Sequence, residues 1–162
     1  MTVVISDTSP INYLVLIGQI DLLPALYQSV LIPDVVLSEL LDEGSPTVVA
    51  AWASMLPAWA EVVITSVGAS GSALDAGELA AITLAESLTG EVLLLMDDSD
   101  GRAEAARRGF RVTGTLGVLR AAAQLRLVDL GLSVEKLSRT NFYLSPRLIA
   151  FLLTEDRNRS SR

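Results

Sequence analysis

The 162-residue sequence contains no cysteine and no histidine. Without cysteine it can form neither a disulfide framework nor a thiolate site. Without histidine, Ser-His catalytic arrangements, imidazole general bases and zinc sites built from His and Cys are also excluded. The side chains that remain for chemistry are carboxylates, hydroxyls and guanidinium groups.

Long apolar runs are also missing. No run reaches the roughly 18 residues that a membrane-spanning helix needs, and the first residues lack the basic segment of a signal peptide, so we expect neither feature. Because 51% of the residues are hydrophobic and 19% are charged, a largely disordered chain is excluded. We expect one domain over residues 1–155, a frayed tail over residues 156–162, and a cytoplasmic location by default.

Positive charge is missing from the first 101 residues, because all 12 Lys and Arg residues lie at Arg102 or later. The same stretch carries most of the 19 acidic residues, several of them inside apolar segments. Burying an unpaired carboxylate is costly. These acids therefore face water, or pair with the later arginines, or hold a metal ion, and the charge pattern leaves the three possibilities open.

Short apolar runs alternate with helix-like segments along the chain. We predict strands near residues 3–5, 30–32, 61–64, 92–96 and 110–112. We predict helices near residues 10–16, 20–27, 33–42, 47–56, 75–88, 101–108, 115–126 and 146–153. Residues 68–72 are predicted to form a loop, and residues 133–143 fit no single class. This alternation predicts a three-layer α/β/α sandwich with a central, mostly parallel sheet of about five strands.

Three acidic residues stand where a parallel sheet places its ligand-binding edge. Asp7 follows the first predicted strand, and Asp97 and Asp98 follow the most apolar one. Because ligands bind beyond the carboxyl ends of such strands, we expect these side chains at a site. Each has a structural alternative as a helix cap or dipole partner, although Ser9 is the predicted N-cap of the first helix, and Asp100 is the more typical cap of the helix near residue 101.

Two glutamates on predicted helices are further candidates. Glu39 shares a helix face with Val36, although Asp42 at the helix end also fits a solvated edge. Glu78 lies on an inward-facing apolar stripe, yet Asp75 and Glu78 also match a capping box. If these carboxylates converge with the strand-end acids, their oxygen ligands suit Mg²⁺ or Mn²⁺. Such an ion can activate water for attack on a phosphodiester.

The order of these motifs resembles that of PIN domains over roughly residues 2–125. The matching segments are Ser6-Asp7-Thr8-Ser9-Pro10, residues 32–40 with Glu39, residues 77–85 with Glu78, the acid pair after Leu93-Leu94-Leu95-Met96, and Gly114-Thr115-Leu116-Gly117. The likeness is greatest to the prokaryotic VapC-like branch with an N-terminal Asp-Thr-Ser-Pro motif. The resemblance implies a PIN-like fold and an Mg²⁺- or Mn²⁺-dependent endoribonuclease, and in many relatives a toxin that a small antitoxin protein neutralises.

Carried over to this chain, the resemblance implies a set of site residues. The metal-binding and catalytic carboxylates would be Asp7, Glu39, Glu78 and Asp98, with Asp97 as a neighbouring metal ligand. Thr8 and Thr115 would support the site, and Arg102, Arg107 and Arg108 could contact the phosphates of an RNA partner. Glu78 stands where other branches have Asp. The resemblance also implies a homodimer, to whose interface Trp52, Trp59, Phe151 and Leu152 could contribute as well as to the core.

Two other functions stay open at this point. One is a PIN-like module that binds RNA or protein with weak or no catalysis. The other is phosphoryl transfer through an aspartyl phosphate, which we place behind the first two. Such sites generally need a lysine near the phosphate, and the only lysine of this chain is Lys136.

Overall fold

The central element of the fold is a parallel sheet. A computed structural model describes residues 1–65 and 74–160, so the loop predicted at residues 68–72 lies outside the described residues. Within these ranges five strands pair in the order β3-β2-β1-β4-β5, all parallel. They are β1 (Val3–Ser6), β2 (Val30–Pro33), β3 (Ala60–Val63), β4 (Val92–Leu95) and β5 (Arg111–Thr113). The predicted three-layer fold around a parallel sheet is confirmed.

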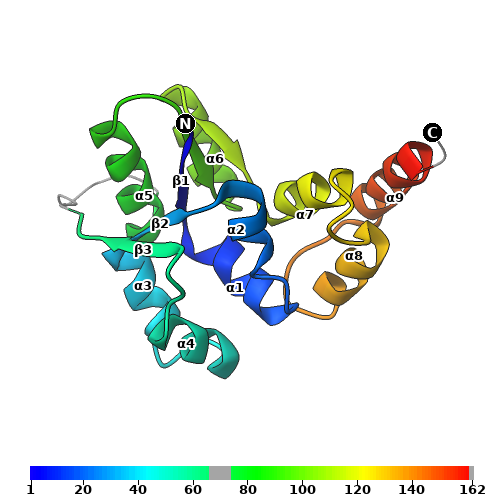
Figure 1. The fold of residues 1–162 in the computed structure, drawn as a ribbon, viewed down its shortest axis with the longest axis horizontal. Coiled ribbons are helices and arrows are strands. Elements are labelled where there is room, and N and C mark those ends of the chain that lie inside the picture. Colours follow the sequence, from blue (N-terminus) through cyan, green and yellow to red (C-terminus); the bar gives the residue numbers. More distant parts are fainter. Residues whose placement is uncertain (66–73, 161–162) are drawn as a thin grey trace.

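Helices connect the strands and extend the chain beyond β5 (Figure 1). Those before β4 are α1 (Thr8–Leu16), α2 (Leu22–Tyr27), α3 (Asp34–Leu41), α4 (Thr47–Ser54) and α5 (Ala76–Ser87). Those after it are α6 (Ser99–Arg107), α7 (Thr115–Gln124), α8 (Leu130–Ser138) and α9 (Pro146–Ser160). Part of the segment that fits no class in the sequence is therefore the end of α8.

Each face of the sheet carries its own apolar core, because successive side chains of a strand point in opposite directions. Val4, Leu93 and Leu95 pack with α1 and α7 on one face. Ile5 and Leu94 pack with α5 and α6 on the other. Burial on both faces explains why β4 is apolar at every position instead of alternating with polar residues.

The C-terminal helices α8 and α9 lie beyond α7, away from the sheet (Figure 1). α9 continues to Ser160 and so extends past residue 156, where the sequence suggests a frayed tail. In that stretch Arg159 pairs with Asp156 and donates to the carbonyl oxygen of Ala123 at 2.7 Å. These contacts tie the end of α9 to the end of α7.

The four aromatic and aliphatic residues considered for a dimer interface have different environments. Leu152 is buried, and Trp52 and Trp59 pack against the core with their ring centroids 5.9 Å apart. Phe151 is exposed on α9. Among these four, Phe151 therefore offers a partner the largest exposed fraction, and the two tryptophans are partly buried.

No helix in the described ranges combines the length and apolar character that a bilayer-spanning segment needs.

The strand order changes direction between β1 and β4. From β1 the chain leads to β2 on one side of the sheet, and from β4 it leads to β5 on the other. The two strands pair in register, with Ser6 opposite Leu95. Because α1 and α6 leave toward opposite faces, a crevice opens beyond the carboxyl ends of these strands, which is where parallel sheets bind ligands.

Candidate active site

A cleft of about 850 Å³ opens at this edge of the sheet. Six of the residues that line it are acidic: Asp7, Glu39, Asp75, Glu78, Asp97 and Asp98. The structure thus brings the five predicted carboxylates together, with Thr8 beside them. Asp75, which the sequence suggests only as a helix cap, is an addition to the set. The sequence feature that could have indicated Asp75 as a site residue is its position three residues before Glu78.

Like Glu78, Asp7 is buried, with 5% of its surface exposed. It occupies the N-cap position of α1, but its side chain makes no capping hydrogen bond. Its Oδ1 is buried and has no hydrogen-bond partner in the described part of the chain. The pKa of Asp7 is raised from 3.8 to about 8, mainly by burial and in part by the charges of Asp75, Glu39 and Glu78, while the Thr8 amide lowers it. The capping alternative therefore does not account for this residue.

Asp7 and Glu39 share a space that depends on a glycine. A β-carbon at Gly77 would lie 2.9 Å from Asp7 Oδ1 and 2.9 Å from Glu39 Oε2. The Thr8 hydroxyl donates to the same Glu39 oxygen and so fixes this carboxylate beside Asp7. Any side chain at position 77 would intrude between the two acids, so Gly77 belongs to the site although the sequence alone did not single it out.

Glu78 both caps its helix and faces inward, and its role at the site stays a prediction. It forms a complete capping box, in which the Glu78 amide donates to Asp75 Oδ1 at 2.8 Å and the Asp75 amide donates to Glu78 Oε2 at 3.2 Å. The same side chain is buried in the cleft. Burial and the nearby Asp75 charge raise the pKa of Glu78 from 4.5 to about 7. The cap fixes where its carboxylate lies.

Asp97 connects three elements of the fold. Its Oδ2 accepts from the hydroxyls of Ser9 and Thr115, each at 2.7 Å, and its Oδ1 accepts from the Thr115 amide at 2.7 Å. Ser9 lies inside α1, so its prediction as the N-cap is wrong, and its hydroxyl holds Asp97 instead. Because both oxygens of Asp97 are occupied, it acts as an anchor between α1, β4 and α7.

Asp98 has the exposed position next to this anchor. Its Oδ2 accepts from the amides of Asp100 at 3.0 Å and Gly101 at 3.3 Å, so Asp98 and not Asp100 caps α6. Both of these bonds use one oxygen of the carboxylate. The capping alternative is confirmed for Asp98, and its position on the cleft is compatible with a second role.

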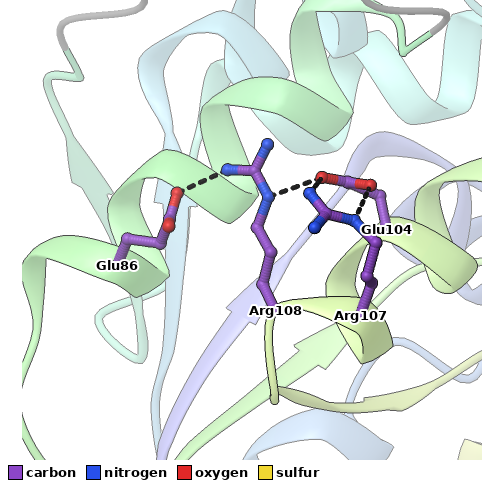
Figure 2. A network of polar contacts seen from close by, with 4 residues as sticks. All are labelled: Glu86, Glu104, Arg107 and Arg108. Carbon is purple, nitrogen blue, oxygen red and sulfur yellow. Dashed lines mark hydrogen bonds and ion pairs between the residues drawn. The ribbon is translucent and has the colours of Figure 1, made fainter.

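The predicted RNA-contacting arginines lie in different places. Arg108 bridges Glu104 of α6 and Glu86 of α5, and Arg107 also pairs with Glu104 (Figure 2). Both lie at the far end of α6, about 12 Å along the helix from its first residue, and neither lines the cleft. Arg102 is in the first turns of α6, and its Nη1 and Asp97 Oδ1 both approach Gly114. Only Arg102 is therefore near the carboxylates.

The acids of the cleft are not neutralised by basic side chains. In residues 1–65 and 74–160, Lys and Arg form ion pairs only with acids outside the cleft, namely Glu86, Glu104, Glu135, Glu155 and Asp156. Of the three possibilities left by the charge pattern, pairing with the later arginines is thereby eliminated for the cleft within these ranges.

The cleft suits a divalent cation by its chemistry. Within the described ranges, no three carboxylates stand close enough together to form a ready-made metal site. The available donors are nonetheless all oxygens, as Mg²⁺ and Mn²⁺ prefer. Asp7 Oδ1 has no hydrogen-bond partner in the described residues, and burial raises the pKa of Asp7 and of Glu78, so a bound cation would stabilise these carboxylates. Asp7 and Glu39, with Glu78 and Asp98 nearby, are the residues that would hold an ion.

A comparison with family models relates this site to known proteins. The PIN-domain family model DUF3368 matches residues 3–157, which is nearly the whole chain. The chain belongs to the PIN-domain family. PIN domains have a nuclease-type fold, are in general nucleases and typically use divalent metal ions. Searches of curated proteins and of solved structures returned no significant match. The resemblance to PIN domains is thus confirmed, and the VapC-like branch stays a prediction.

Proposed function

We propose that this PIN domain is an Mg²⁺- or Mn²⁺-dependent endoribonuclease that hydrolyses RNA phosphodiester bonds at the cleft between β1 and β4. The observation that carries the proposal is the buried Asp7 carboxylate, whose Oδ1 has no partner in the described part of the chain, beside Glu39. Two carboxylates in this setting repel each other unless a proton or a cation lies between them.

The acids of the cleft have separate roles in this proposal. Asp7 and Glu39 hold the ion, with Glu78 and Asp98 as further ligands. When bound, the ion activates water and offsets the charge on the phosphate. Thr8 orients Glu39 through its hydroxyl. Asp97 keeps the ends of β1 and β4 in place through its bonds to α1 and α7.

A role as the toxin of a toxin–antitoxin pair is the finer part of the proposal. It is supported by the Asp-Thr-Ser-Pro motif of the VapC-like branch and by the exposed Phe151 on α9, which suits a homodimer or a small antitoxin. Such a toxin would act on RNA in the cytoplasm. A short upstream reading frame that overlaps the gene of this chain would support it.

The test compares two changes of Asp to Asn. We expect the wild-type protein to cleave single-stranded RNA with Mn²⁺, EDTA to stop the reaction, and Asp7→Asn to lower kcat/KM by at least about 100-fold. Asp21→Asn is the matched control, because Asp21 also occupies an N-cap position without a capping bond but lies outside the cleft. If Asp7→Asn and Asp21→Asn cleave equally well, the proposal is wrong.

A module that binds without cleaving is the second candidate, favoured by the absence of a ready-made group of three carboxylates in the described ranges. Intact RNA after incubation of the folded wild-type protein with Mn²⁺ would support it over the nuclease. Two observations disfavour the phosphotransfer alternative. No lysine of the described residues lines the cleft, and both carboxylate oxygens of Asp97 already accept hydrogen bonds. Stable aspartyl phosphorylation by a small phosphodonor would restore it.

A further inference from the structure

An exposed tyrosine stands at the rim of the acidic cleft. Tyr143 lines the cleft although 84% of its surface is exposed to solvent. The preceding residues are fixed, because Phe142 packs edge-on against Tyr13 with ring centroids 4.9 Å apart, and Tyr13 donates to Asn141 Oδ1 at 2.8 Å. Tyr143 is thus held at the rim by an anchored segment, with its ring left uncovered.

A second hollow, of about 440 Å³, borders this segment at Asn141 and lies between the ends of α1 and α8. Lys136, Arg139 and Asn141 are among the residues that line it. Lys136 forms no ion pair within the described ranges, and Arg139 pairs only with the exposed Glu135 one turn earlier on α8. A surface pair of this kind contributes little and can be exchanged for a phosphate contact.

The exposed Tyr143 and the basic hollow bear on how an acidic cleft could bind RNA. Six carboxylates at the cleft repel a polyanion, so the RNA on either side of the scissile bond needs cations to hold it. Arg107 and Arg108 cannot supply them, because they lie at the far end of α6 and do not line the cleft. Lys136 and Arg139, next to the segment that carries Tyr143, can.

We propose that Tyr143 stacks on an unpaired base beside the cleft while Lys136 and Arg139 bind the adjoining phosphates, so that these three residues form a subsite for the RNA that flanks the scissile bond. The inference rests on the proposed nuclease function and assigns the residues that hold the flanking strand. Aromatic rings bind single strands because every base offers a face for stacking, whereas the bases of a duplex are already stacked. The basic side chains add affinity that does not depend on sequence.

The experiment measures binding separately from cleavage. In an Asp7→Asn background, the Kd for a fluorescent single-stranded RNA of about 12 nucleotides is measured by anisotropy, with a duplex of the same sequence as comparison. We expect Tyr143→Ala to weaken binding of the single strand roughly tenfold and Tyr143→Phe to restore it. Arg107→Ala serves as the control and should leave the Kd unchanged.

The salt dependence tests the two basic residues. Replacing both Lys136 and Arg139 by Ala should lower the slope of log K against log salt by about 0.7 for each lost phosphate contact. In otherwise wild-type enzyme, Tyr143→Ala should raise KM and leave kcat nearly unchanged, because the ring touches the flank and not the scissile bond. All variants are first checked by their thermal melting curves.

The outcomes separate the two proposals. If the wild-type protein cleaves RNA but Tyr143→Ala changes neither Kd nor KM, the inference fails and the nuclease function stands. Tighter binding of the duplex than of the single strand also overturns it. If the stacking pattern appears and no RNA is cleaved, the nuclease function fails and the single-strand site stands.

Discussion

At the residue scale, the site is defined by charges that the fold leaves uncompensated. Asp7 is buried and forms no ion pair within the described residues, and Glu39, Asp75 and Glu78 are close enough to raise its pKa. A carboxylate in this position destabilises the folded protein unless it binds a proton or a metal ion. The fold therefore keeps an energetically costly arrangement, as is common where residues are placed for binding or catalysis.

Gly77 gives a prediction at the same scale. An alanine there would place its β-carbon 2.9 Å from Asp7 Oδ1 and from Glu39 Oε2. Because alanine is the better helix former by up to about 1 kcal/mol, we expect the stability of Gly77→Ala to change by no more than about that amount. Its Mn²⁺ affinity should fall at least about tenfold, because the methyl group separates the two carboxylates. Isothermal titration calorimetry and urea unfolding measure the two effects.

Gly131→Ala is the matched control for this change. Gly131 lies in the first turn of α8, and its added β-carbon would also approach a carboxylate, Asp129 Oδ1, at 3.3 Å. It lies outside the cleft. Equal loss of Mn²⁺ affinity in both variants would show that the space around Gly77 is not part of the metal site.

At the element scale, Asp97 determines how α1 and α7 meet the end of β4. Its three hydrogen bonds reach residues 9 and 115, which are far apart in the chain, and Thr115 is fully buried. Because the acceptor is the partly buried carboxylate of Asp97, these hydrogen bonds are stronger than hydrogen bonds between neutral groups. The carboxylates on both sides of the crevice depend on this connection for their relative positions.

Thr115→Val tests the connection between these elements. Valine keeps the shape of the side chain and the hydrogen bond from the backbone amide to Asp97 Oδ1. It removes the hydroxyl that donates to Asp97 Oδ2. We expect a loss of about 1–3 kcal/mol in the free energy of unfolding, measured with urea, together with lower kcat. Thr154→Val is the control, since the Thr154 hydroxyl only bonds the carbonyl of its own helix at Ala150. Equal effects of the two changes would contradict the anchoring role.

At the scale of the whole molecule, the cleft makes stability depend on pH. The pKa of Asp7 is raised from 3.8 to about 8 and that of Glu78 from 4.5 to about 7, in both cases mainly by burial. Between about pH 4 and pH 8 the folded protein therefore binds more protons than the unfolded chain. The stability of the metal-free protein must fall as pH rises through this window, because deprotonation leaves buried charges without partners.

We accordingly expect the melting temperature in EDTA to be higher at pH 5.5 than at pH 8. Added Mn²⁺ should raise it more at pH 8, where the ion does not compete with protons. Asp7→Asn should flatten the pH dependence and stabilise the metal-free protein, whereas Asp21→Asn should preserve the slope. A melting temperature that increases toward pH 8 in EDTA would contradict the assignment of Asp7 and Glu78 as buried acids of raised pKa.

The arrangement of elements was predictable because local patterns and tertiary packing agree. The run of apolar residues at β4 requires burial on both faces, and this alone points to a parallel sheet between helices. The carboxyl ends of β1 and β4 then determine that Asp7, Asp97 and Asp98 meet. The prediction that Ser9 caps α1 was wrong, because the helix begins at Thr8 and places Ser9 inside its first turn, where the hydroxyl donates to Asp97 at the end of another strand.

Other features depend on contacts between distant segments. Tyr143 stands at the cleft because the segment after α8 returns to α1, which no local pattern indicates. Arg107 and Arg108 follow the site acids closely in sequence, but helix α6 carries them away from the cleft to Glu86 and Glu104 (Figure 2). Closeness in sequence does not predict closeness to the cleft here, because an α-helix advances about 1.5 Å per residue along its axis.

The sequence by itself determined the chemistry: with no His and no Cys, and with no Lys or Arg before Arg102, oxygen ligands and a shortage of positive charge were settled from the start. The tertiary structure decided how that shortage is distributed. It leaves the cleft acids without an ion pair within the described ranges and directs five arginines to acids outside the cleft, namely Glu86, Glu104, Glu135, Glu155 and Asp156. The physical reason is that residue types set which ligands exist, whereas burial and distance, which arise only on folding, set which charges remain uncompensated.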